Sequence, residues 1–275
     1  METQYLNMLE DILFNGRKIM DRTGVGTLSI FGAQMKFSLQ DQFPLLTTKK
    51  IFWKGPVIEL FWMLRGETNT KFLNDFGITI WNEWSSPSGD LGPVYGKQIR
   101  DFNGTDQLKT LLERIKTNPN CRRLIISMWN PAELKDMALP PCPVLIQFDV
   151  HDGKLSSHLY QRSADMFLGV PFDLASYSLL TYLIAKECGL EPYEFTYSFG
   201  NAHIYLNHIE QVKEQLKRKP LPFPKLEINF PTNLMDLINV FHKLEWNKGE
   251  HVSIQDIISL KDYSSHPSIK AEVAV

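Results

Sequence analysis

The sequence lacks several features that would assign a function class at once. Its 275 residues contain three cysteines, Cys121, Cys142 and Cys188, and their spacing is not that of a metal site. So few cysteines, and an odd number of them, are typical of a reducing compartment. The 29 basic residues are balanced by 31 acidic ones, so no global positive field attracts nucleic acid. We therefore expect a metal-free protein that binds any anionic ligand through a local group of arginines.

Long apolar runs, linkers and repeats are also missing. No apolar stretch reaches the length of a transmembrane helix, and the first residues lack the basic-then-apolar pattern of a signal peptide. No change in composition marks a domain boundary. These absences predict a single domain over residues 1–275 and a cytoplasmic location.

The spacing of apolar residues predicts an α+β fold with a mixed or antiparallel sheet and flanking helices. Helical spacing covers residues 4–15, 53–65, 105–117, 173–188, 205–218 and 233–244. Strand patterns cover 27–40, 124–129 and 252–260, and a hairpin is expected over 144–163 around Asp152-Gly153. The alternation in 27–40 changes phase at Gly32, which predicts a β-bulge there.

Cys142 is the candidate nucleophile. It stands between prolines 140, 141 and 143 at the start of the hairpin, whose return strand brings Arg162 back toward it. A thiol reacts as its thiolate, and a neighbouring guanidinium favours that form without exchanging protons. A cysteine hydrolase with His203 as its base is a second possibility, although a cysteine that enters a strand between prolines argues against it.

Other residues have both a structural and a functional interpretation. Glu59 lies in an otherwise apolar helix, so it is either one member of a buried structural pair or a carboxyl that gives and takes protons in the reaction. Trp81 and Trp84 are either core or a stacking wall for a flat ligand. Arg122 and Arg123 are either solvated or an anion clamp, and the glycine-bearing loop at 21–27 is either a plain turn or a phosphate contact.

At this point several runs resemble the thymidylate synthase family. They are DRTGVGT at 21–27, GPVYGKQ at 92–98, LPPC at 139–142, YQRSAD at 160–165 and FLGVPF at 167–172. The resemblance extends from the N-terminal helix to the AEVAV tail. It implies transfer of a one-carbon unit from 5,10-methylenetetrahydrofolate to C5 of a pyrimidine deoxynucleotide, with Cys142 adding to C6 of the ring and no metal.

The same resemblance implies a role for each site residue. Catalytic roles fall to Cys142, Glu59, Arg162, Tyr95 and Asp165. Arg22, Arg162 and Ser163 hold the 5′-phosphate, together with Arg122 and Arg123 from the partner subunit of a sheet-mediated homodimer, and His203 and Tyr205 contact the deoxyribose. The folate-facing positions are Ile80, Trp81, Trp84, Leu139, Asp165, Leu168, Gly169, Phe172 and, in the tail, Ala274.

Two residues depart from the family pattern: Asp173 replaces Asn, and Pro143 replaces His. An Asn amide matches the N3–H and O4 of uracil, whereas a protonated Asp matches the N3 and N4–H₂ of cytosine. An ionised Asp matches cytosine in the same way when the cytosine is protonated at N3. An ionised Asp accepts from uracil N3–H but leaves O4 without a donor, which costs about ten- to a hundredfold in selectivity. Asp173 therefore predicts a preference for dCMP. The alternative is that Asp173 merely caps a helix that it begins.

The product is less well determined by the sequence. Trp81 and an intact tail would keep water from the reacting carbon, which favours 5-methyl-dCMP. Asp at this position instead resembles the phage deoxycytidylate hydroxymethylases of the same family, which favours 5-hydroxymethyl-dCMP. A conventional thymidylate synthase acting on dUMP and a binding protein built on the same fold, for example for RNA, are the remaining alternatives.

Overall fold

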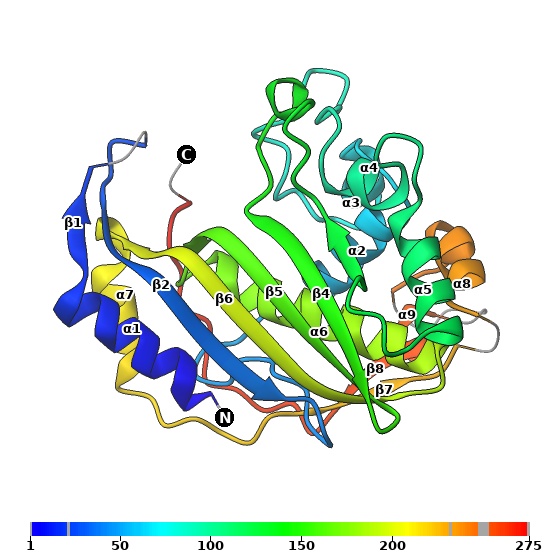
Figure 1. The fold of residues 1–275 in the computed structure, drawn as a ribbon. Helices are drawn as coiled ribbons and strands as arrows, with labels where there is room; N and C mark the ends of the chain where they lie inside the picture. Colours follow the sequence, from blue (N-terminus) through cyan, green and yellow to red (C-terminus); the bar gives the residue numbers. More distant parts are fainter. Residues whose placement is uncertain (1, 21–22, 231–232, 247–252, 274–275) are drawn as a thin grey trace.

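The computed structural model describes residues 2–20, 23–230, 233–246 and 253–273. Its centre is a mixed sheet of six strands in the order β1-β2-β6-β5-β4-β3 (Figure 1). The strands are β1 (Arg17–Ile19), β2 (Thr27–Ser38), β3 (Ile125–Ser127), β4 (Pro143–His151), β5 (Lys154–Asp165) and β6 (Glu191–Tyr205). β5 and β6 run parallel and the other neighbours antiparallel, which confirms the predicted α+β fold with a mixed sheet.

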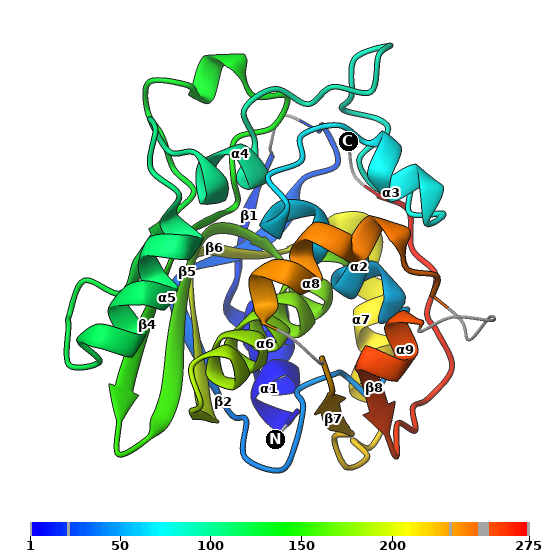
Figure 2. The same cartoon turned by 90° about the vertical axis from the view of Figure 1, so that its right-hand side faces the viewer.

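Helices cover one side of this sheet (Figure 2). They are α1 (Thr3–Asn15), α2 (Lys54–Leu64), α3 (Lys71–Asp75), α4 (Tyr95–Arg100), α5 (Gln107–Thr117), α6 (Gly169–Glu187), α7 (Ile209–Leu216), α8 (Leu234–Val240) and α9 (Ile254–Ile257). A separate ribbon pairs β7 (Lys225–Ile228) with β8 (Ile258–Lys261). None of the helices in the described ranges is both long and apolar enough to cross a membrane.

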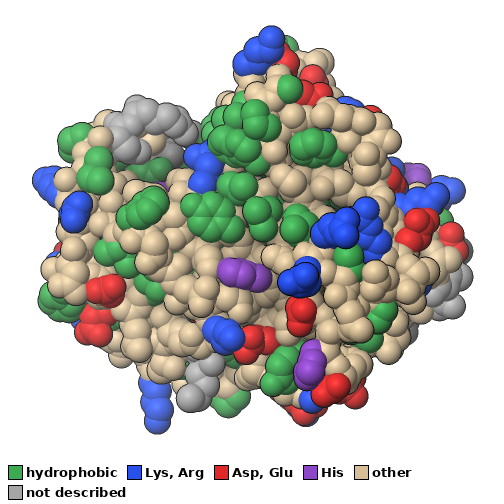
Figure 3. All heavy atoms as spheres, in the orientation of Figure 1, with side chains coloured by type: hydrophobic (Ala, Val, Ile, Leu, Met, Phe, Trp, Pro, Cys, Tyr) green, Lys and Arg blue, Asp and Glu red, His purple; other side chains and the backbone are tan. Residues whose placement is uncertain are grey.

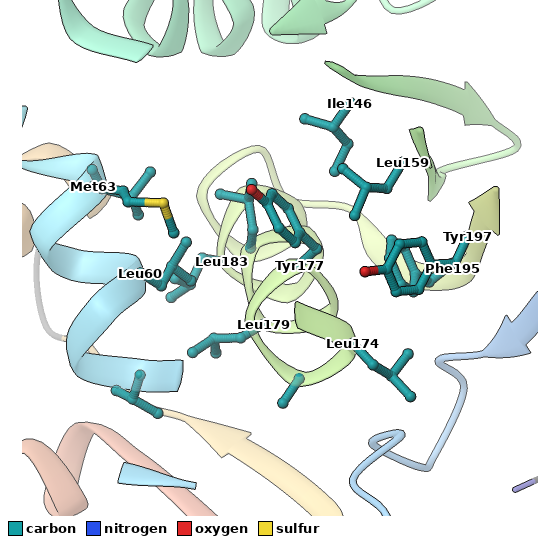
Figure 4. Packing of buried hydrophobic residues seen from close by; sticks show 14 of the residues in the cluster. Leu60, Met63, Ile146, Leu159, Leu174, Tyr177, Leu179, Leu183, Phe195 and Tyr197 are labelled. Atoms are coloured by element: carbon teal, nitrogen blue, oxygen red, sulfur yellow. The ribbon is translucent and has the colours of Figure 1, made fainter. Parts of the chain in front are cut away.

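Helix α6 is the centre of the core, packed between α2 on one side and strands β5 and β6 on the other (Figure 4). Because both sides are covered, its apolar residues occur all around the helix rather than on one stripe. Leu179 and Leu183 face α2, and Phe195 and Tyr197 approach from β6. Each fully buried side chain of this size contributes about 1.5–3 kcal/mol to folding. The same packing fixes the position of every polar group carried by α6.

The hairpin of β4 and β5 forms as predicted. Asp152 and Gly153 have φ angles of 49° and 73°, the left-handed pair that a two-residue turn requires. The resulting register places Pro143 opposite Gln161. The Arg162 backbone N–H donates to the Cys142 carbonyl at 2.9 Å. The turn sets the register as far as Leu145, and a register shift between Pro143 and Leu145 completes the pairing that makes the cysteine and the arginine neighbours.

Three local predictions are wrong in detail. The pairing of β2 with β6 continues across Gly32 without a register shift, so no residue is inserted; Gly32 instead has a φ of 78°. In segment 252–260, the described part begins as helix α9, because Ser253 and Asp256 form a capping box, and only Ile258 to Leu260 are strand.

The third correction concerns Asp173, which does not begin its helix. α6 starts at Gly169, four residues earlier than predicted, with Leu168 at the N-cap position. Pro171 lies in the first turn, where a backbone N–H has no intrahelical partner and a proline is tolerated. Asp173 is therefore inside the helix, and the interpretation of it as a cap is wrong.

The face of the sheet turned away from the helices is open (Figure 3). Register partners Lys36, Thr196, His158, Gln147 and Ile125 form a row across it. Two large apolar side chains are exposed in this region. Tyr160, two residues beyond His158 on β5, is 37% exposed, and Ile125 on β3 is 40% exposed. Apolar and charged side chains alternate over this surface, with apolar ones gathered above its centre.

Candidate active site

A cavity of about 690 Å³ collects most of the predicted site residues. Its size is within the usual range for small-molecule sites. Its walls come from α2, the 80–84 segment, α4, the loop before β4, β5, the start of α6, the end of β6 and the tail. The predicted residues that line it are Glu59, Ile80, Trp81, Trp84, Tyr95, Leu139, Cys142, Arg162, Ser163, Asp165, Leu168, Gly169, Phe172, Asp173, His203 and Tyr205.

Cys142 is held from two sides. Its backbone N–H donates to the Tyr95 hydroxyl oxygen at 3.0 Å. The Arg162 guanidinium donates to the carbonyls of Pro141 at 2.8 Å and Pro140 at 2.7 Å, and one of its nitrogens lies 4.0 Å from Cys142 Sγ. The arginine therefore fixes the loop that carries the thiol and also places a positive charge beside it. This is the arrangement that favours a thiolate.

Glu59 enters the cavity from the middle of α2. Trp81 donates its indole N–H to Glu59 Oε1 at 2.7 Å. Burial raises the pKa of Glu59, and the hydrogen bond from Trp81 opposes part of that rise. A carboxyl in this environment retains its proton to a higher pH than an ordinary glutamate does. A carboxyl with a raised pKa is suited to giving and taking protons.

Asp173 faces the same cavity from α6. Burial, and secondarily the nearby Glu59 carboxyl, raise the pKa of Asp173 to about 7. The Tyr197 hydroxyl lies 3.5 Å from Asp173 Oδ2, and Tyr197 also donates to Gln161 Oε1. The site thus contains two carboxyls in which burial favours the neutral form.

The polar end of the cavity is built from β5 and β6. Ser163 and Asp165 pair with Asn201 and His203 in the parallel ladder. Asp165 Oδ1 accepts from the backbone N–H groups of residues 167 and 168, at 2.9 and 3.1 Å, and so fixes the turn into α6. His203 Nδ1 lies 2.9 Å from Asn201 Oδ1, and Tyr205 packs against the imidazole edge to face.

An aromatic wall closes the opposite side. Trp81 packs edge to face with Trp84 at 5.9 Å and with Tyr95 at 5.7 Å between ring centroids. Leu168 and Phe172, near the start of α6, line the cavity as well. A flat ring bound here meets apolar surface on its faces and polar groups at its edges.

Two predicted residues that the structure describes are not in the lining. Arg122 and Arg123 are exposed beside the edge strand β3 and lie outside this cavity. Arg22 and Ala274 fall outside the described residues.

The sequence argument missed other residues that line the cavity, among them Met63, Tyr177, Asn201, Ala271 and Val273. Tyr177 follows Asp173 by one helical turn, so helical spacing from Asp173 would have found it. Asn201 precedes His203 by two residues in a strand, which puts both on one face. Within the described ranges, no three His, Cys, Asp or Glu side chains are grouped so that they would hold a metal ion.

The fold and the cavity together place a thiol beside an arginine in a partly apolar site that suits a flat, polar-edged ligand. Comparison with known proteins names the family. A model of the family described as thymidylate synthase matches residues 3–275. Curated relatives named thymidylate synthase, from the Dugway, Henzerling II and Nine Mile phase I strains of Coxiella burnetii, are 52% identical over 278 aligned residues, which cover 99% of this chain and 99% of each relative. The chain belongs to the thymidylate synthase family.

Membership defines the general reaction. The enzyme transfers a methyl group to C5 of a pyrimidine nucleotide, with methylenetetrahydrofolate as co-substrate. The cavity suits a nucleotide together with a folate, because its polar groups gather at the β5 and β6 end and its aromatic and apolar groups at the other. The aromatic wall and the start of α6 offer the apolar surface that a folate ring system requires.

Proposed function

We propose that this enzyme prefers dCMP to dUMP. The observation that carries the proposal is the Asp173 carboxyl, which lines the cavity and stays protonated to about pH 7. A neutral carboxyl donates one hydrogen bond to N3 of cytosine and accepts another from its N4–H₂. An ionised carboxyl accepts from uracil N3–H and leaves uracil O4 facing a negative charge. An amide at this position would not exert that repulsion.

The reaction begins with Cys142. Its thiolate adds to C6 of the ring, and the electron pair of the C5–C6 double bond becomes available at C5. Methylenetetrahydrofolate supplies the one-carbon unit and, in the methylating reaction, the hydride. Tyr95, which is hydrogen-bonded to the Cys142 amide, assists removal of the C5 proton, which expels tetrahydrofolate and leaves an exocyclic methylene at C5. Hydride from tetrahydrofolate, which becomes dihydrofolate, converts this methylene to methyl, and expulsion of the Cys142 thiolate restores the C5–C6 double bond. Arg162 stabilises the thiolate both before addition and after expulsion.

Glu59 handles protons at the exocyclic side of the ring. Its raised pKa lets it donate a proton when negative charge develops at the 4-position and recover it afterwards. Ser163 and Arg162 bind the 5′-phosphate, and His203 and Tyr205 contact the sugar. These roles are supported by the position of all five side chains on one cavity.

We propose 5-methyl-dCMP and dihydrofolate as the products. Trp81, whose indole is bonded to Glu59, and the tail residues Ala271 and Val273 line the cavity where the one-carbon unit would be transferred. Apolar groups there keep water from the reacting carbon. Access of water would instead give 5-hydroxymethyl-dCMP and tetrahydrofolate.

The experiment is to incubate the enzyme with methylenetetrahydrofolate and either dCMP or dUMP. We expect a larger kcat/KM for dCMP, a methylated nucleotide by mass spectrometry, and one dihydrofolate per turnover by absorbance. A hydroxymethylated product without dihydrofolate would overturn the product assignment alone. A larger kcat/KM for dUMP would show a conventional thymidylate synthase, the alternative that the 52% identity to curated thymidylate synthases favours.

The use of dCMP should fall as pH rises. The Asp173 proton is retained below its pKa of about 7 and lost above it, so kcat/KM for dCMP is expected to fall about tenfold per unit above that pH. The Asp173→Asn variant checks that this pH dependence comes from Asp173. Its kcat/KM for dUMP should not show the fall with rising pH. The other titratable groups that interact with Asp173 are Glu59, Tyr95, Asp165, Tyr177 and Tyr197.

We further propose a homodimer formed by the open face of the sheet, in which Arg122 and Arg123 bind phosphate in the partner's site. The exposed Ile125 and Tyr160 on that face, and the position of both arginines outside their own cavity, support this arrangement (Figure 3). Self-association through one shared face gives two identical sites.

The shared site predicts complementation. Cys142→Ser subunits and subunits carrying both Arg122→Ala and Arg123→Ala should each be almost inactive when refolded alone. When the two kinds of subunit are refolded together, half of the dimers contain one of each. One of the two sites in such a mixed dimer is complete, so about a quarter of wild-type activity should return. Failure of the mixture to exceed its components would show that the arginines do not act across an interface.

A further inference from the structure

A neutral carboxyl does not by itself choose between the two pyrimidines. With its proton on one oxygen, Asp173 matches cytosine. With the proton on the other oxygen, it presents a donor to uracil O4 and an acceptor to N3–H. A dCMP-selective site that works with a protonated Asp173 therefore needs a group that makes the two oxygens unequal.

Tyr197 is placed to do this. It is fully buried on β6, and its hydroxyl points toward α6 (Figure 4). The hydroxyl lies 3.5 Å from Oδ2 of Asp173 and donates to Gln161 Oε1. Gln161 is itself 2% exposed and donates its amide N–H to the Ser163 carbonyl at 2.9 Å, which directs Oε1 toward Tyr197. Gln161 also hydrogen-bonds Asp173, so the three side chains form a connected relay between β5, β6 and α6.

The relay treats the two Asp173 oxygens differently. While Tyr197 donates to Oδ2, that oxygen is an acceptor, and a proton on the carboxyl rests on Oδ1. A proton on Oδ2 would put two O–H groups against each other unless Tyr197 gave its proton wholly to Gln161. Pairing with cytosine needs Oδ2 as an acceptor and therefore keeps the hydrogen bond from Tyr197. Pairing with uracil needs a proton on Oδ2 and therefore displaces that hydrogen bond.

We propose that Tyr197 is a specificity-determining positioning residue: its hydroxyl keeps Asp173 Oδ2 as the acceptor, opposite the 4-amino group of cytosine, with Oδ1–H toward N3. This inference rests on the proposed preference for dCMP and explains how a carboxyl that is neutral in the cavity maintains it. Tyr197 does not need to touch the nucleotide, because it acts through Asp173.

The test is Tyr197→Phe. The ring packs on Phe195 and Phe199, with centroids 5.4 and 4.3 Å away, and phenylalanine preserves that packing. We expect the ratio of kcat/KM for dCMP to that for dUMP to fall about tenfold, the effect of one hydrogen bond, mainly because dUMP is used better. Tyr182→Phe is the matched control: it removes a hydroxyl that donates to backbone carbonyls of residues 39 and 42, away from the cavity, and should leave the ratio unchanged.

A second variant tests the direction of the effect. Gln161→Leu removes both the acceptor that competes for the Tyr197 proton and the hydrogen bond that Gln161 itself makes to Asp173. Tyr197 then donates to Asp173 without competition, so the ratio should hold or rise even if overall activity falls. Equal losses on both nucleotides in Tyr197→Phe, or an unchanged ratio in an enzyme that prefers dCMP, would overturn the role of Tyr197 and leave the proposed function standing. A wild-type enzyme that prefers dUMP would overturn both.

Discussion

Replacing Cys142 with serine should lower kcat by at least about a thousandfold on either nucleotide. A serine hydroxyl is not ionised near neutral pH, and Arg162 cannot make it so, because an arginine stabilises an existing anion without accepting a proton. The substitution preserves the fold, since the loop is held through backbone groups of residues 140–142, which serine retains. Steady-state turnover, with circular dichroism to verify folding, is the measurement.

Cys188→Ser is the matched control for that loss. Cys188 follows the last turn of α6, outside the cavity lining, and burial raises its pKa to about 11, so it is a thiol at neutral pH. Its replacement should leave kcat unchanged. If Cys142→Ser retained wild-type turnover, the addition of a thiolate to the ring would be wrong, and a binding role for this fold would have to be reconsidered.

Asp173→Asn should lower the dCMP to dUMP ratio of kcat/KM by about a hundredfold. The amide has two N–H donors on one nitrogen, so it can give one to uracil O4 and the other to Tyr197 while its oxygen accepts from N3–H. The gain is therefore expected mostly on dUMP, as about ten- to a hundredfold in kcat/KM. Parallel kinetics on both nucleotides measure it.

Asp165→Asn is an informative contrast to that substitution. Asp165 lines the same cavity, but its Oδ1 accepts from the backbone at the turn into α6. Its replacement should reduce use of both nucleotides without changing their ratio. If the Asp173→Asn enzyme kept the wild-type ratio of kcat/KM for dCMP to that for dUMP, the Asp173 carboxyl would not determine which base is bound.

The nucleophile could be predicted from the sequence because its geometry depends on local rules. The Asp152-Gly153 turn sets the hairpin register as far as Leu145, which is enough to bring Arg162 back toward the loop of Cys142. The exact pairing also depends on a register shift between Pro143 and Leu145, which the turn does not predict. Glu59 was identifiable for a similar reason, since a lone carboxyl in an apolar helix requires a special environment.

The base-reading end of the cavity could not be predicted in the same way. No spacing rule brings Glu59 on α2 next to Asp173 on α6; their approach follows from how the two helices pack. The apolar pattern predicts a helix that begins at Asp173, whereas α6 begins four residues earlier, at Gly169, because a proline in the first turn does not interrupt a helix. Tyr177 and Tyr197 fit the apolar pattern of the core, and the direction of their hydroxyls depends on tertiary contacts.

The central claim is that Asp173 makes this member of the thymidylate synthase family an enzyme for cytosine nucleotides. Its most direct test is a competition assay with equal concentrations of dCMP and dUMP, limiting enzyme and saturating methylenetetrahydrofolate, in which mass spectrometry follows both substrates in one tube. The account predicts that dCMP is consumed first and that 5-methyl-dCMP appears before any dTMP. Consumption of dUMP ahead of dCMP would contradict it.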